Sequence, residues 1–239
     1  MSGIGHMRRG IIVHRHHRNV LLAILVLFLT VVLVLLLIAV GEVAFERIGF
    51  SSLEYVVILT GTLVGSTINI PVAEAHSSEP LVDVQEVRAF GLYYRIPRIE
   101  YKQVSTVIAV NVGGAVIPVL VSTYLLAAHS GLVPAAMAGS FLTAILVHLA
   151  ARKVRGVGIV TPALLPPIAA AVIAYLLSPG SPAIVAYVSG TLGALIGADL
   201  TNLRGITKLG APVASIGGAG TFDGVFLTGL LAVLLVPLL

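Results

Sequence analysis

The chain contains no cysteine, and only 10% of its 239 residues are charged. Without cysteine, the protein cannot form disulfide bonds, bind a metal through thiolates or use a cysteine nucleophile. Hydrophobic residues make up 58% of the sequence, far more than the core of a soluble domain of this length requires. The composition therefore predicts an integral membrane protein.

Positive charge is concentrated near the N-terminus. Four arginines there account for the formal net charge of +4: Arg8, Arg9, Arg15 and Arg18. Basic residues beside membrane spans are typical of cytoplasmic segments, so this charge predicts orientation and no nucleic-acid partner. The same region contains four histidines, but a charged tail does not fix their geometry for a metal: His6, His14, His16 and His17. We interpret residues 1–19 as a cytoplasmic basic tail and expect no metal site and no cofactor.

Seven apolar runs are each long enough to cross a bilayer, which requires about 20 residues. They occupy residues 20–41, 53–72, 104–127, 131–151, 157–177, 182–203 and 211–237. The Lys and Arg residues of the connections alternate from side to side, which places the N-terminus in the cytoplasm and the C-terminus outside. The sequence thus predicts an all-α, multi-pass protein of the cell membrane. Residues 20–239 form one transmembrane domain whose main partner is the lipid bilayer.

One connection, residues 73–103, is long enough to fold by itself. Its second part, from Pro80 to Gln103, is rich in Val, Ile and Tyr, partly alternates in polarity and is divided by Phe90-Gly91. This pattern predicts a small cytoplasmic β-hairpin inserted into the helical domain. The other interpretation is an irregular amphipathic linker.

Two short motifs occur twice in the same direction. The motif Gly-Thr-Leu occurs at 61–63 and again at 190–192, and Val-Gly-Gly-Ala at 112–115 resembles Ile-Gly-Gly-Ala at 216–219. If the repeat is genuine, the two copies are related by an axis along the membrane normal, and the hairpin is inserted in the first copy only.

Two acidic residues, Asp199 and Asp223, fall inside consecutive predicted spans. An ionised side chain in hydrocarbon costs about 2.5–3.5 kcal/mol on insertion scales, so each requires a reason. Two carboxylates at hydrogen-bonding distance in a low dielectric cannot both ionise at neutral pH and would share one proton. Such a pair suits general acid–base hydrolysis: one carboxylate takes a proton from water and the other donates to the scissile carbonyl oxygen. The glycines around Asp223 leave room for a polypeptide.

The stretch Gly-Ala-Gly-Thr-Phe-Asp-Gly at 218–224 resembles the Gly-x-Gly-Asp helix of presenilin and signal-peptide-peptidase intramembrane proteases, and Pro-Ala-Leu at 162–164 is similar to their Pro-Ala-Leu element. The resemblance implies that Asp199 and Asp223 are the catalytic pair and that a transmembrane peptide is the substrate. Six residues would then shape the substrate site: Pro162, Ala163, Leu164, Gly218, Gly220 and Gly224.

Over most of its length the chain resembles an uncharacterised prokaryotic family of small multi-pass membrane proteins, a domain of unknown function. Five stretches carry this likeness: Thr-Ile-Asn-Ile-Pro at 67–71, Asn-Val-Gly-Gly at 111–114, Gly-Ile-Val-Thr-Pro at 158–162, Gly-Ala-Asp-Leu at 197–200 and the glycine-rich stretch at 218–224. This resemblance implies the membrane class and supplies no activity.

Two other functions fit the same residues. In an ion-coupled transporter or channel, Asp199 and Asp223 would bind H⁺ or Na⁺, and Asn69, Asn111 and Asn202 would line the path of a small ion or solute through broken helices. In a non-catalytic scaffold, Asp199 would be an interfacial residue paired with Arg204 or Lys208.

The depth of the two aspartates also limits the protease hypothesis. A straight helix over 211–237 would place Asp223 about 22 Å beyond Lys208, whereas Asp199 lies only about 7 Å from Arg204. The carboxylates would then lie at different levels of the bilayer. The hypothesis therefore requires a break in the seventh span, and Gly210, Pro212 and the glycines at 217–220 predict one.

Overall fold

The computed structural model describes residues 15–89, 92–154, 158–206, 213–218 and 224–239. By its internal contacts the chain divides into two units, residues 1–41 and residues 42–239. Helix α1 (Arg15–Arg47) begins in the first unit and ends in the second. In the first unit its large apolar side chains are exposed, as illustrated by Leu27 and Phe28, which are 65% and 61% exposed.

Within the described residues, three helical stretches are long and apolar enough to cross a membrane: Leu22–Arg47, Ser130–Ala150 and Pro182–Asn202. Four shorter apolar helices accompany them: Ser52–Gly65, Val112–Ala128, Leu165–Leu177 and Gly224–Leu238. The protein is therefore a mostly helical membrane protein. The apolar side chains exposed on these helices are the surface that lipid would cover.

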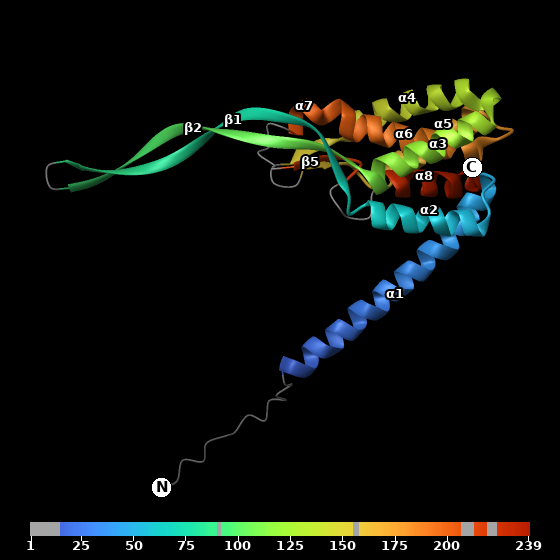
Figure 1. The fold of residues 1–239 in the computed structure, drawn as a ribbon, viewed down its shortest axis with the longest axis horizontal. Coiled ribbons are helices and arrows are strands. Elements are labelled where there is room, and N and C mark those ends of the chain that lie inside the picture. Colours follow the sequence, from blue (N-terminus) through green and yellow to red (C-terminus); the bar gives the residue numbers. More distant parts are fainter. Residues whose placement is uncertain (1–14, 90–91, 155–157, 207–212, 219–223) are drawn as a thin grey trace, which may run out of the picture. The chain divides into compact units, whose positions relative to one another are not determined.

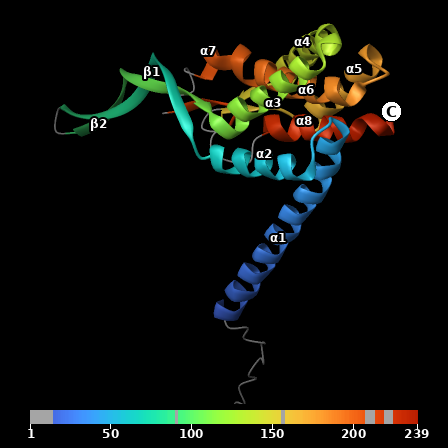
Figure 2. The ribbon, with the colours of Figure 1, turned by 45° about the vertical axis from the view of Figure 1, so that its right-hand side comes forward.

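The second unit is a bundle around helix α6 (Figures 1 and 2). Its longer helices are α2 (Ser52–Gly65), α3 (Ile117–Ala128), α4 (Val133–Ala150), α5 (Leu165–Leu177), α6 (Pro182–Ala194) and α8 (Gly224–Leu235). Its shorter elements are the π-helices η1 (Val112–Val116) and η3 (Leu195–Asp199), the 3₁₀-helices η2 (Ser130–Leu132), η4 (Leu200–Asn202) and η6 (Val236–Leu238), and α7 (Leu203–Ile206). Helix α6 contacts α3, α4, α5 and α8, and every residue from 184 to 191 is buried.

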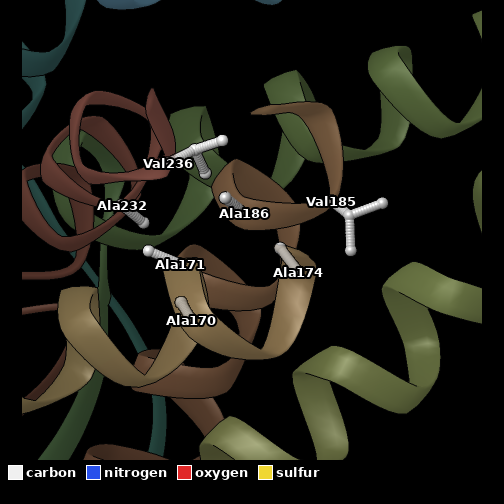
Figure 3. Close-up of a cluster of buried hydrophobic side chains, with 7 residues drawn as sticks. All are labelled: Ala170, Ala171, Ala174, Val185, Ala186, Ala232 and Val236. Atoms are coloured by element: carbon white, nitrogen blue, oxygen red, sulfur yellow. The ribbon is translucent and has the colours of Figure 1, made fainter. Parts of the chain in front are cut away.

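Small side chains allow this close packing. Figure 3 shows one buried cluster, in which α5, α6, α8 and η6 meet through five alanines and two valines: Ala170, Ala171, Ala174, Val185, Ala186, Ala232 and Val236. On the other side of α6, a Cβ added to Gly193 would lie 2.6 Å from the Thr143 Cβ, and one added to Gly197 would lie 2.4 Å from the Ala144 carbonyl oxygen. Helices associate in lipid mainly through such close packing.

Aromatic rings attach the end of α1 to this bundle. The Phe45 side chain is fully buried, and its ring centroid lies 4.9 Å from that of Tyr55, 5.7 Å from that of Tyr187 and 6.1 Å from that of Phe226. These rings come from α1, α2, α6 and α8. The residues that follow Gly41 therefore belong to the second unit.

The strands of the second unit all lie in three of its connections. The hairpin of β1 (Asn69–Ala89) and β2 (Leu92–Asn111) joins α2 to α3, the short pair β3 (Arg152–Val154) and β4 (Gly158–Val160) joins α4 to α5, and β5 (Val213–Ile216) precedes α8. Strand β5 pairs in parallel with β2, so the sheet order is β1-β2-β5. We call the end of the bundle where α2 ends and α3 begins the strand-bearing end (Figures 1 and 2).

The expected hairpin is present and is longer than expected. Its antiparallel pairing runs from Asn69 opposite Asn111 to Ala89 opposite Leu92, with one irregularity between Pro71 and Ala73. The predicted connection began at 73 and ended at 103 because the residues beyond these limits are apolar. Their apolar side chains belong to a sheet rather than to the ends of helices.

For the same reason four predicted helical spans are helical only in part. Residues 69–72 belong to β1, so α2 ends earlier than its apolar run. Residues 104–111 continue β2, residues 158–160 form β4 and residues 213–216 form β5, so α3, α5 and α8 begin later than their apolar runs. Gly217 and Gly218 follow β5 with φ angles of 84° and 94°, which no α-helix contains. The seventh run is therefore interrupted, as the protease hypothesis requires.

A backbone contact joins α2 to η1 beside the sheet. A Cβ added to Gly113 would lie 2.1 Å from the Thr62 carbonyl oxygen and 2.4 Å from the Ser66 nitrogen. Backbone cannot rotate away as a side chain can. Gly113 therefore sets how closely α2 approaches the start of α3.

We expect Gly113→Ala to lower the free energy of unfolding in detergent by about 1–3 kcal/mol, because the two backbones must separate. Gly180→Ala is the matched control, since a Cβ there meets nothing within 4 Å. Unfolding can be followed by circular dichroism with increasing denaturant. Equal stability of the two variants would contradict the close contact between α2 and η1.

Candidate active site

A cavity of about 360 Å³ opens near the strand-bearing end of the bundle. Parts of α4, β4, α5, α6, η3 and α8 surround it. The described residues that line it are Val147, Ile159, Thr161, Ala163, Leu164, Pro166, Ala194, Ala198, Asp199, Gly218, Gly224, Val225, Leu227, Thr228 and Leu231. Its wall is mostly apolar and includes several alanines and glycines.

Asp199 is the one charged side chain among these described lining residues. It is the last residue of η3, where α6 widens into a π-helical turn. Its Oδ2 atom accepts a hydrogen bond of 2.7 Å from the Gly217 N–H. Single π-helical turns are frequent at functional sites because they redirect side chains within a helix.

Gly217 can make this bond because it has no side chain. Its φ of 84° is in the left-handed region, and a Cβ there would lie 2.6 Å from the Ala115 nitrogen and the Gly114 carbonyl carbon. Any other residue would be strained and would push β5 away from η1. The glycine at position 217 therefore allows its backbone N–H to lie against the Asp199 carboxylate.

Asn202 stabilises the end of this helix and does not line the cavity. Its Nδ2 atom donates to the Gly197 and Ala198 carbonyl oxygens at 3.1 and 3.0 Å. The Thr201 hydroxyl also donates to the Gly197 oxygen at 2.8 Å. These bonds satisfy carbonyl groups that the π-helical turn leaves without their usual helical partners.

Asn69 and Asn111 lie at the base of the sheet and also do not line the cavity. The Asn69 Oδ1 atom accepts hydrogen bonds from the Ser215 hydroxyl at 2.5 Å and from the Asn111 Nδ2 at 3.1 Å. Asn111 is 1% exposed; its Nδ2 also donates to the Ser66 carbonyl oxygen at 2.7 Å, and its Oδ1 accepts from the Gly114 N–H at 2.8 Å. Both asparagines connect sheet strands, and their solute-binding role in the transporter hypothesis stays a prediction.

The structure brings together five of the predicted site residues: Asp199, Ala163, Leu164, Gly218 and Gly224. Pro162 lies between the two lining residues Thr161 and Ala163 without lining the cavity itself. Gly220 and Asp223 lie outside the described residues, so the pairing of Asp199 with Asp223 stays a prediction. Asp223 directly precedes Gly224 in the sequence.

Sequence analysis missed two hydroxyl residues of the cavity, Thr161 and Thr228. Thr161 belongs to the Gly-Ile-Val-Thr-Pro stretch, and Thr228 follows the glycine-rich stretch at 218–224. The Thr228 hydroxyl donates to the Gly224 carbonyl oxygen at 2.6 Å. Threonines are common in membrane helices, so only their place beside Asp199 distinguishes these two.

The described residues contain no group of three or more His, Asp or Glu side chains that could hold a metal ion. In the same part of the chain, Asp199 has a backbone partner, the Gly217 N–H. The interfacial hypothesis pairs Asp199 with Arg204 or Lys208, whose side chains lie outside what the structure describes. The described geometry therefore gives a carboxylate in an apolar cavity, held by one backbone donor.

These features define a mostly helical membrane protein with a small sheet at one end of its bundle and a single carboxylate in an apolar cavity among the described residues. The chain belongs to the family described as "Protein of unknown function (DUF1614)", whose model matches residues 63–235. This confirms the resemblance to an uncharacterised family. No curated protein and no solved structure matches the chain.

Removing the carboxylate should destabilise the fold, because the buried Gly217 N–H would lose its acceptor. For Asp199→Ala we expect a loss of about 1–3 kcal/mol in the free energy of unfolding. For Asp199→Asn, whose amide oxygen can still accept this bond, we expect a loss below about 1 kcal/mol. Unfolding in detergent measures both. Equal losses would show that the Gly217 bond contributes nothing.

Proposed function

We propose that the protein is an intramembrane aspartyl protease in which Asp199 and Asp223 form the catalytic pair. One observation carries the proposal: Asp199, Ala163, Leu164, Gly218 and Gly224 line a single cavity, although they come from separate elements of the fold. The resemblance to presenilin and signal-peptide-peptidase proteases assigns a catalytic or substrate-binding role to each of these residues. That motifs separated in the sequence share one cavity with a carboxylate supports the proposal.

The cavity suits hydrolysis of a peptide bond. One ionised aspartate takes a proton from a water molecule, whose oxygen attacks the peptide carbonyl carbon. The second, protonated aspartate donates its proton to the carbonyl oxygen, which yields a tetrahedral intermediate. Return of a proton to the amide nitrogen breaks the C–N bond. The Gly217 N–H would keep Asp199 in place during both steps.

The cavity also suits a substrate that arrives from the bilayer. Leu164 lines the cavity and is 63% exposed, and Val160, next to the lining residue Ile159, is 45% exposed. Apolar residues that are exposed in this bundle face lipid. A transmembrane peptide could therefore reach Asp199 without crossing a polar surface, and the small residues of the wall leave space for its backbone.

Ion-coupled transport is the second candidate, and the interrupted helices favour it. The turns η1 and η3 and the break before α8 resemble the discontinuous helices that form ion sites in transporters. In this case Asp199 and Asp223 would carry H⁺ or Na⁺. A non-catalytic scaffold would use neither carboxylate.

We also propose that the strand-bearing end faces the cytoplasm. The connections at this end contain Arg88, Arg95, Arg98, Lys102, Arg152, Lys153, Arg155, Arg204 and Lys208. The connections at the other end contain one such residue, Arg47. The positive-inside rule therefore supports a multi-pass protein of the cell membrane with its N-terminus in the cytoplasm and its C-terminus outside.

A cleavage assay in liposomes tests the protease. We expect the reconstituted protein to cleave a helical transmembrane peptide, and we expect Asp199→Asn and Asp223→Asn each to lower the rate at least about a thousandfold. Asp83→Asn, which changes the one other aspartate of the sequence, is the matched control and should cleave normally.

Three other results would lead to different conclusions. Proton or Na⁺ flux that both variants lose, without cleavage, would replace the protease with a transporter. Full cleavage by Asp199→Asn would remove Asp199 from the mechanism. Neither cleavage nor flux in the wild type, with both variants indistinguishable from it, would favour the scaffold.

Reporter fusions test the orientation. An alkaline phosphatase fused after Leu239 should be active, because this enzyme folds only outside the cytoplasm, and a fluorescent protein at the same place should be dark. A fluorescent protein inserted after Phe90, in the sequence between β1 and β2, should be bright. The opposite pattern would invert the orientation of the whole bundle.

A further inference from the structure

Strand β5 leads directly into the backbone donor of the site. Its last residue, Ile216, precedes Gly217, whose N–H donates to the Asp199 carboxylate. Whatever holds β5 therefore also holds this N–H. The attachments of β5 decide how well Asp199 is oriented.

The ladder that attaches β5 is short. Strand β5 pairs with β2 over only four positions, from Val107 opposite Val213 to Val110 opposite Ile216. The pairing is parallel, which is slightly weaker per residue than antiparallel pairing. Because this parallel ladder is only four residues long, a side-chain hydrogen bond can add to the attachment of β5.

The Ser215 hydroxyl supplies this additional attachment. It donates to the Asn69 Oδ1 on β1 at 2.5 Å, although β2 lies between β1 and β5 in the sheet. The bond therefore bridges the central strand and ties β5 to the base of the hairpin.

Asn69 is in turn held by a buried partner. Its Oδ1 accepts from the Asn111 Nδ2 at 3.1 Å, and Asn111 is fixed by the Ser66 carbonyl oxygen and the Gly114 N–H. Gly114 and its neighbour Ala115 form the backbone against which Gly217 packs. The same small region thus fixes the acceptor for Ser215 and the position of Gly217.

We infer that Asn69 and Ser215 are positioning residues, which hold β5 so that the Gly217 N–H orients the Asp199 carboxylate in the cavity. The bond between them is exposed, so its loss should affect the stability of the fold little. Loss of the bond should mainly change the position of β5, the strand that the bond holds. The kinetic part of this inference rests on the proposed protease function, and the structural part does not.

The test compares Ser215→Ala and Asn69→Ala with the wild type in liposomes, with two readouts. We expect kcat for cleavage of a transmembrane peptide to fall about tenfold while KM changes less than about twofold, because Asp199 acts on the reaction and not on substrate docking. We also expect hydrogen exchange of the Gly217 amide to become about tenfold faster, since its bond to Asp199 opens more often.

Two further variants separate positioning from general structure. Ser215→Thr keeps the hydroxyl and should restore both readouts. Val213→Thr changes an exposed side chain of the same strand while the Ser215 hydroxyl stays in place, and it should leave both unchanged. Circular dichroism establishes that each variant is folded.

Four outcomes would overturn the inference. The first is an alanine variant with normal kcat although its Gly217 amide exchanges faster, and the second is unchanged exchange in both alanine variants. The third is failure of Ser215→Thr to restore exchange, and the fourth is loss of folded protein in both alanine variants. If the wild type does not cleave the peptide, the proposed function fails. The exchange readout then decides the positioning of the Gly217 amide alone.

Discussion

In a bilayer, every backbone N–H and C=O group must find a partner within the protein, because no water is available to bond it. Regular helices meet this requirement by themselves. The strand-bearing end of this bundle does not, because the chain there passes through a π-helical turn at η3, a four-residue strand at β5 and two glycines with positive φ. At the break before α8, the Gly217 N–H has no helical acceptor, and its hydrogen bond to Asp199 supplies one. The Asp199 side chain therefore supports the break as a hydrogen-bond acceptor as well as being a candidate for chemistry.

Close packing allows the irregular segments to reach one another. Gly113 lets η1 approach α2, Gly217 lets the end of β5 approach η1, and Gly197 lets η3 approach α4. At each of these positions the nearest atom that a Cβ would meet belongs to backbone. The glycines here act at contacts between unlike elements, and not only between pairs of straight helices. Beside these contacts, the cavity at Asp199 is lined by aliphatic side chains together with several alanines and glycines.

Much of the membrane class could be predicted from the sequence, because soluble domains rarely contain apolar runs of about 20 residues. The limits of the helices could not be predicted. Residues Val107–Val110 and Val213–Ile216 are as apolar as the end of a helix, and only their pairing with each other, across 106 residues of sequence, makes them strands. The site divides in the same way. Asp199 was a candidate because of its residue type, and the Pro-Ala-Leu stretch because of its resemblance to intramembrane proteases; both contribute to the lining of the cavity. The sheet roles of Asn69 and Asn111 depend instead on Ser215 and Ser66, which lie far from them in sequence or in another element. Polarity alone marks an asparagine as unusual and does not show what it bonds.

The internal repeat gains meaning from the pairing of β2 with β5. A repeat whose copies run in the same direction places equivalent segments parallel, and these two strands are parallel neighbours, each followed by two adjacent glycines and then a helix. The motif match aligns Val112 with Ile216, whereas the ladder pairs Val110 with Ile216. A shift of two residues keeps every side chain on the same face of a sheet, so the register is compatible with the match. The two glycine pairs nevertheless differ: Gly113 and Gly114 lie in a π-helix, and Gly217 and Gly218 form a left-handed turn. If the repeat is genuine, this difference directs an N–H toward Asp199 in its second copy, and the site then depends on the asymmetry between the copies rather than on their likeness.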